Sequence, residues 1–103
     1  MEVVRVDRSP TGRVAVLTLV GDLDMADAPD VRAALGRLEG APLVVVDLSE
    51  VTFLDSTILG VFVGANKRGP LVLVNPSGEP LKAIRMTGLH HLLTGAPAQR
   101  QPL

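Results

Sequence analysis

Two stretches of the chain are apolar without alternating polar positions, and they predict strands of a parallel sheet. Residues 43–48 read LVVVDL, and residues 71–74 read LVLV. Strands of parallel sheets are covered on both faces and therefore lack the alternation of a half-exposed strand. We expect both segments to be adjacent, central, parallel strands.

The segment before the first of these strands has the periodicity of an amphipathic helix. Its apolar residues recur at i, i+3, i+7 and i+10, which aligns them in one stripe; they are Ala28, Val31, Leu35 and Leu38. Asp27 and Asp30 have the spacing of a capping box, with Asp in place of the usual Glu or Gln. We therefore expect the helix to begin at these aspartates, with Pro29 in its first turn.

The remaining elements complete an alternation of strands and helices. Residues 3–6 and 13–20 are β-branched segments separated by the turn cluster Ser9-Pro10-Thr11-Gly12, which predicts a hairpin. A second helix is expected at Ser56–Arg68, and a short third one begins near Pro80 and stops at Gly88. The order predicts an α/β domain with right-handed crossovers and a mixed, mainly parallel sheet.

Composition limits the classes of function. Of 103 residues, 47% are apolar and 20% are charged, which predicts one globular domain. We expect this domain at residues 1–94 and a flexible tail at residues 95–103, because the pattern of strands and helices fades after Leu93. The chain has no cysteine, no evident signal peptide and no apolar run of bilayer length, so we expect a cytoplasmic protein without a membrane partner. A net charge of −1 and only two aromatic residues argue against a nucleic-acid partner. No residue pattern in the sequence predicts a metal or cofactor site.

Three polar segments each follow a predicted parallel strand, namely residues 21–24, 49–56 and 75–78. The carboxyl ends of parallel strands share one edge of a sheet, where ligands and partners bind. We therefore expect one shared site that contains Asp22, Asp24, Asp55, Ser56 and Asn75. Loops between strands and helices are also polar for structural reasons, so a purely structural explanation stays open.

The start of the second helix carries two hydroxyl groups beside a carboxylate, in the sequence Asp55-Ser56-Thr57. Ordinary helix capping explains these residue types. A phosphate on a hydroxyl here would meet unpaired N–H groups and a favourable helix dipole, so the domain should tolerate phosphorylation.

Apolar residues of the same helix cover about 200° of the helical wheel, at about 100° per residue; they are Ile58, Leu59, Val61, Phe62 and Val63. Either the helix is buried on two sides, or part of this surface is exposed for a partner. On the second interpretation, Leu59 and Val63 contact the partner.

Taken together, these motifs resemble the STAS domain of bacterial anti-sigma-factor antagonists. The similarity extends from about Arg13 to Leu93 and is carried by GDLD, VVVDLSEVTFLDST, LGVFVGANKR, LVLVNPSG and IRMTGLHHLL. It implies a sheet of four or five strands with helices, and a partner-switching role. The unphosphorylated antagonist binds an anti-sigma factor that is also a serine kinase, which frees the sigma factor, and a serine phosphatase reverses the phosphorylation.

The resemblance also assigns roles to residues. It implies that Ser56, directly after Asp55, is the phosphorylated serine, and that Asp24, with Asp22 beside it, is the acidic residue of the first loop. Asn75 matches the asparagine of the third loop. The partner-binding residues expected on this basis, together with the exposed part of the second helix, are Asp22, Asp24, Asp55, Ser56, Thr57, Leu59, Val63 and Asn75.

Three departures from the family pattern leave an alternative open. Ile58 stands where the family usually has glycine, which raises the question of whether its side chain crowds the kinase. The turn after Lys67-Arg68 is shorter than usual, and no final amphipathic helix is evident after Thr94. The alternative is a phosphorylation-insensitive STAS adaptor in a stress-sensing or transport complex.

An enzymatic function would have to use Ser56 and Asp55 with His90 or His91. No nucleophile elbow, oxyanion signature or metal spacing supports it. We therefore expect the protein not to be an enzyme.

Overall fold

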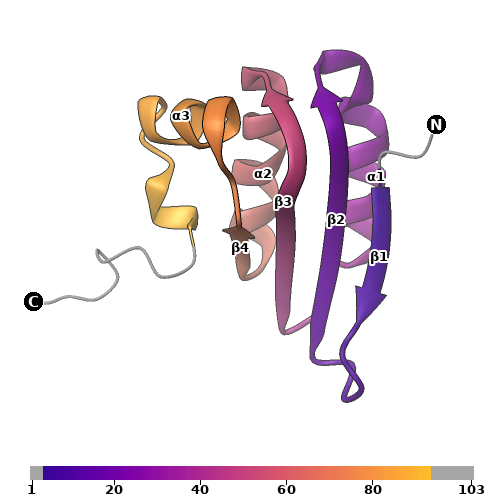
Figure 1. Ribbon diagram of the computed structural model, residues 1–103. Helices are drawn as coiled ribbons and strands as arrows, with labels where there is room; N and C mark the ends of the chain where they lie inside the picture. Colours follow the sequence, from indigo (N-terminus) through magenta and orange to yellow (C-terminus); the bar gives the residue numbers. More distant parts are fainter. Residues whose placement is uncertain (1–3, 94–103) are drawn as a thin grey trace, which may run out of the picture.

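The computed structural model describes residues 4–93, so the tail predicted at residues 95–103 lies outside the described residues. Strands and helices alternate along the chain after an initial hairpin (Figure 1). The elements in chain order are β1 (Val4–Arg8), β2 (Val14–Leu23), η1 (Met25–Asp27), α1 (Ala28–Arg37), β3 (Leu43–Leu54), α2 (Ser56–Arg68), β4 (Leu71–Val74), α3 (Gly78–Met86) and η2 (His90–Leu92), where η marks a 3₁₀ helix. Within residues 4–93, no helix is long and apolar enough to cross a membrane.

The four strands form one sheet in the order β1-β2-β3-β4. β1 pairs antiparallel with β2, and β2, β3 and β4 are parallel to one another, which confirms the hairpin and the mixed α/β sheet. β4 is adjacent to β3 as predicted, but it lies at the edge of the sheet, so the prediction that it is central is wrong. Within the described residues, its outer side carries one isolated bridge, between Leu73 and Leu93.

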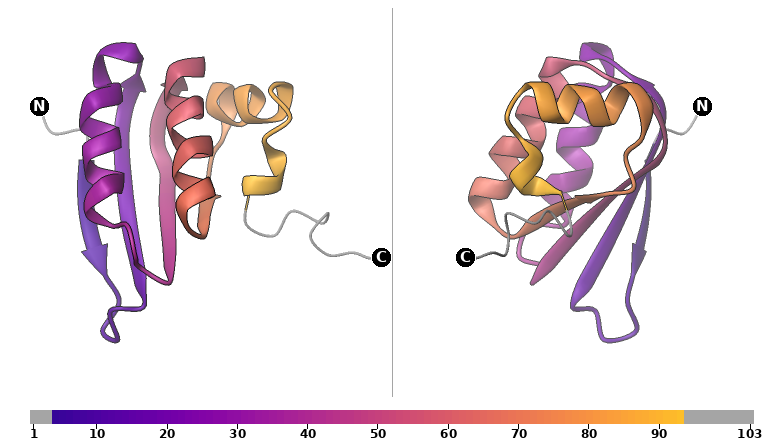
Figure 2. Two further views of the ribbon diagram at one scale, coloured as in Figure 1. Left: turned by 180° about the vertical axis from the view of Figure 1, so that it is seen from behind. Right: turned by 60° about the vertical axis from the view of Figure 1, so that its left-hand side comes forward.

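Helices α1 and α2 both pack on the same face of the sheet (Figures 1 and 2). The opposite face carries Val16, Val45 and Val72, which are paired side by side across three strands and are half-buried. The expectation that both faces of the apolar strands are covered is therefore wrong. Valine is favoured on a pleated, half-buried surface, so an unbroken valine run does not require two covered faces.

β3 runs to Leu54, six residues further than predicted, and two irregularities each add one residue to it relative to β2. Thr18 pairs with Asp47 but Val20 pairs with Glu50, and the register shifts again between Gly21 and Asp22. Each shift changes the spacing of core-facing positions on β3 from two residues to three, so Leu48, Val51 and Leu54 are all buried. Most of the two segments expected as loops, residues 21–24 and 49–56, therefore belongs to strands.

Most of the core lies between the sheet and the two helices on its covered face, and it extends to Ile84 of α3 and Leu92 of η2. The largest side chains fully buried there include Phe62, Leu17 and Leu48. Helix α2 spans the residues predicted for it and buries its apolar surface in this core, which favours the structural explanation of its wide apolar arc. Gly88 follows the end of α3 with a φ of 76°, as expected for the residue after a helix.

Candidate functional site

Ser56 is the first residue of α2, and its hydroxyl faces solvent. The preceding residue, Asp55, caps the helix: its Oδ1 accepts hydrogen bonds from the backbone N–H groups of Thr57 at 3.0 Å and of Ile58 at 3.2 Å. Among residues 4–93, no group is hydrogen-bonded to the Ser56 hydroxyl. The capped start of α2 thus presents a solvent-exposed hydroxyl that makes no hydrogen bond within the described residues.

A second turn with a capped start lies at the end of β2. The backbone N–H of Ala26 donates to Asp24 Oδ1 at 2.9 Å, and the N–H of Asp24 donates to Asp27 Oδ2 at 3.0 Å, which forms a capping box on η1. The capping box predicted at Asp27 and Asp30 is therefore wrong by one turn. Both pairs have the same i, i+3 spacing, and the short 3₁₀ turn before α1 takes the earlier pair.

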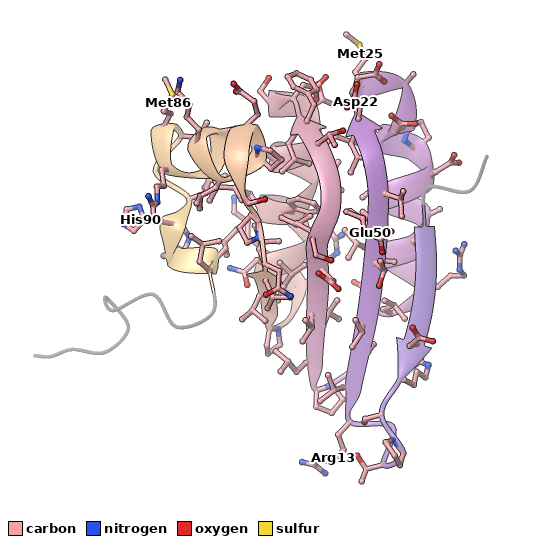
Figure 3. All side chains as sticks on the ribbon, in the orientation of Figure 1. Arg13, Asp22, Met25, Glu50, Met86 and His90 are labelled. Atoms are coloured by element: carbon pink, nitrogen blue, oxygen red, sulfur yellow. The ribbon has the colours of Figure 1, made fainter. Side chains whose placement is uncertain are left out.

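Pairing of β2 with β3 brings the two turns together. Leu23 pairs with Leu54, and the backbone N–H of Asp55 donates to the carbonyl of Leu23 at 3.2 Å. The Thr52 hydroxyl on β3 donates a hydrogen bond to the carboxylate of Asp22, the residue before Leu23 on β2. Asp22, Asp24, Asp55 and Ser56 thus lie at one end of the sheet, where Figure 3 labels Asp22.

Asn75 does not share this end of the sheet. β4 stops at Val74, which pairs with Asp47, eight residues before Asp55. Two of these eight residues are the extra residues of the bulges, and the remaining six advance along the strand by about 3.3 Å each. Asn75 therefore lies roughly 20 Å from the start of α2. Asn75 instead donates from Nδ2 to Asp47 Oδ1 at 3.4 Å, with its backbone at a φ of 59°. Its predicted place beside Ser56 is wrong, because β4 is eight residues shorter than β3.

The apolar residues of α2 that we expected at the partner surface are largely inaccessible. Leu59 is 3% exposed, and Val63 is half-buried. A direct partner contact by Leu59 is therefore wrong for this structure. Ile58 is 0% exposed, so its branched side chain packs in the core and leaves the approach to the Ser56 hydroxyl open.

Sequence reasoning missed two exposed apolar side chains next to these turns. Met25 is the first residue of η1 and is 69% exposed, and Phe53 pairs with Asp22 and is 43% exposed. A methionine in a tight turn directly after the capping residue Asp24 was the available signal.

The described residues contain no group of three or more His, Cys, Asp or Glu able to hold a metal ion.

A family model described as "Mlab, STAS domain" matches residues 6–94 of the chain. The anti-sigma-B factor antagonist of Bacillus subtilis is 36% identical over 84 residues, covering 75% of this chain and 76% of that protein. The protein of the same name from Listeria monocytogenes is 35% identical over 82 residues, covering 73% and 72%. An anti-sigma factor antagonist from Mycobacterium paratuberculosis has a similar structure, with a TM-score of 0.78 and 26% identity over 88% of this chain and 81% of that one.

Proposed function

Because this chain belongs to the STAS-domain family of anti-sigma-factor antagonists, we propose that it binds an anti-sigma factor and that phosphorylation of Ser56 switches this binding off. The chain is a non-enzymatic regulator, as anti-sigma factor antagonists are. In the proposed cycle, the anti-sigma factor is a serine kinase that modifies its own antagonist, and a serine phosphatase restores it. We place this cycle in the cytoplasm, together with the sigma factor that it controls.

The observation that carries the proposal is the exposed Ser56 hydroxyl at the capped start of α2. A phosphate there would lie at the positive end of the helix dipole, close to the N–H groups of the first turn. The Asp55 carboxylate already satisfies two of these groups, so the helix start does not need the phosphate to form. Phosphorylation is therefore expected to change the surface charge of the domain and to leave its fold intact.

The switch follows from the charge that phosphorylation adds. A phosphoserine carries about −1.5 to −2 charge at neutral pH, and here it would stand beside Asp55 and near Asp24. A partner docked over this end must either desolvate the phosphate or be repelled by it. Such mismatches cost several kcal/mol, and about 1.4 kcal/mol is already tenfold in affinity.

The alternative of a phosphorylation-insensitive adaptor rested largely on Ile58. The buried position of its side chain removes the proposed obstruction, because nothing of that side chain reaches the surface around Ser56. This supports the regulated antagonist over the adaptor.

The test combines phosphate uptake with binding. The purified protein is incubated with ATP and each anti-sigma kinase of its organism, and its intact mass is measured. We expect one phosphate on the wild type and on Thr57→Ala, and none on Ser56→Ala. In titration calorimetry against the same anti-sigma factor, Ser56→Ala should bind as the wild type does, and Ser56→Asp at least tenfold more weakly.

Two results would contradict the proposal in different ways. Binding without phosphate uptake, with every kinase tried, would favour the unregulated adaptor. Phosphate on Thr57 in place of Ser56 would move the switch by one residue and refute its assignment.

A further inference from the structure

We propose that Met25 and Phe53 are the apolar anchors of the partner-binding surface around Ser56. In the complex they insert into an apolar pocket of the anti-sigma factor that is bordered by basic side chains. The inference rests on the proposed function and replaces the surface of α2 as the source of apolar contact. We define the anchor pair as these two residues.

The anchor pair is unusual among the described apolar residues because it is exposed. In residues 6–93, the large hydrophobic side chains that are clearly exposed number four: Val6, Met25, Phe53 and Met86. Met25 is one residue beyond Asp24, and Phe53 is three residues before Ser56. Phe53 pairs with Asp22, which is three residues before Met25, so the two anchors lie near the same end of β2 and β3.

Both anchors lie on hydrogen-bonded backbone. Met25 lies inside the capping box, in which the side chains of Asp24 and Asp27 each accept a hydrogen bond from a backbone N–H group of the same turn. Phe53 lies on β3 at the position opposite Asp22, whose carboxylate accepts a hydrogen bond from the adjacent Thr52. Side chains presented on ordered backbone lose less conformational entropy on binding. Methionine and aromatic residues are also enriched in the cores of protein interfaces.

The charge around the anchor pair specifies the chemistry of the partner. Four aspartates lie within three residues of one of the anchors along the chain, and one of them, Asp22, also pairs with Phe53: Asp22, Asp24, Asp27 and Asp55. Residues 14–31 and 38–66, which supply this end of β2 and β3 and the start of α2, contain no Lys or Arg. A complementary partner therefore carries Lys or Arg around its apolar pocket. Acidic or neutral surfaces do not meet this requirement.

Met86 offers a matched control within the same chain. It is 75% exposed and is labelled in Figure 3 at the same end of the molecule as Met25, but it belongs to α3. Lys82 and Arg85 on that helix give it basic neighbours in place of acidic ones. A partner whose pocket is bordered by basic groups should not bind over Met86, because like charges would repel.

The experiment measures binding of the unphosphorylated protein to its anti-sigma factor by titration calorimetry. Met25→Ser and Phe53→Ser should each weaken binding at least tenfold, which is about 1.4 kcal/mol, whereas Met86→Ser should stay within twofold of the wild type. Phe53→Leu, which keeps an apolar side chain on β3, provides a second variant in case Phe53→Ser unfolds. It should bind between the wild type and Met25→Ser. Added salt should weaken wild-type binding.

The outcomes separate this inference from the proposed function. Wild-type binding that Met25→Ser and Phe53→Leu leave unchanged would refute the anchor pair and leave the antagonist function standing. An equal loss in Met86→Ser would also overturn the inference, since any exposed methionine would then suffice. A wild type that binds none of the organism's anti-sigma factors would refute the proposed function and this inference with it.

Discussion

Removal of the Asp55 carboxylate tests how far one side chain holds the start of α2 and, with it, the position of Ser56. In Asp55→Ala, the N–H groups of Thr57 and Ile58 lose an acceptor that lies 3.0 and 3.2 Å away. Loss of an N-cap side chain costs about 0.5–2 kcal/mol, and loss of the negative charge at a helix N-terminus costs about 0.3–1 kcal/mol more. We expect the free energy of unfolding to fall by about 0.8–3 kcal/mol, combining these two contributions.

Urea denaturation of the wild type, Asp55→Ala and Asp55→Asn measures both parts. Asparagine keeps an oxygen that can accept the two hydrogen bonds, so Asp55→Asn should lose only the charge contribution of about 0.3–1 kcal/mol. Salt should shrink the difference between wild type and Asp55→Asn, because it screens the dipole. In thermal unfolding, each kcal/mol should lower the midpoint by about 4–8 °C for a domain of this size.

Two results would refute this reasoning. An Asp55→Ala variant as stable as the wild type would mean that the cap contributes nothing. An Asp55→Asn variant as unstable as Asp55→Ala would mean that charge, and not hydrogen bonding, holds the helix start. Asp30→Ala, which removes an exposed first-turn acid of α1, is the control for charge alone.

Two further predictions test the corrected positions of residues outside this turn. Leu59→Glu should abolish cooperative thermal unfolding or lower its midpoint steeply, because it places a charge in the core; Val63→Glu, at a half-buried position, should cost less, and equal midpoints would contradict the assigned burial. Asn75→Gly should change the free energy of unfolding in urea by under about 0.5 kcal/mol, since glycine accepts the φ of 59°. Asn75→Ala should cost roughly 1 kcal/mol because of the left-handed backbone, and the reverse order would contradict it.

Elements whose signals are local could be predicted from the sequence. Helix α2 begins and ends where expected, because Asp55 caps its start and Gly69-Pro70 follows its end within the same short segment. The hairpin was predicted for the same reason, from the turn cluster between two β-branched segments. The family resemblance is confirmed as well, because it rests on several motifs in order.

Features that depend on contacts between distant segments could not be predicted. The two bulges of β3 arise from its register against β2, and they turned expected loop residues such as Asp22 into strand residues. The separation of Asn75 from Ser56 depends on where β4 stops beside β3, which no residue of either strand announces. Both follow from pairing geometry, which acts between chain segments and leaves no local pattern.

Turn residues, periodicity and capping act over a few neighbouring residues. The order of elements, the parallel strands and the serine at a capped helix start could therefore be predicted from the sequence. Which surface is available to a partner depends instead on how the folded elements pack. The apolar arc of α2 has the composition of a binding surface, yet packing against the sheet buries most of it. Met25 stands exposed at the end of the sheet in Figure 3, and Phe53 is exposed although the next residue on β3, Leu54, is buried. Burial is a property of what packs against a residue, and only the folded chain supplies that neighbour.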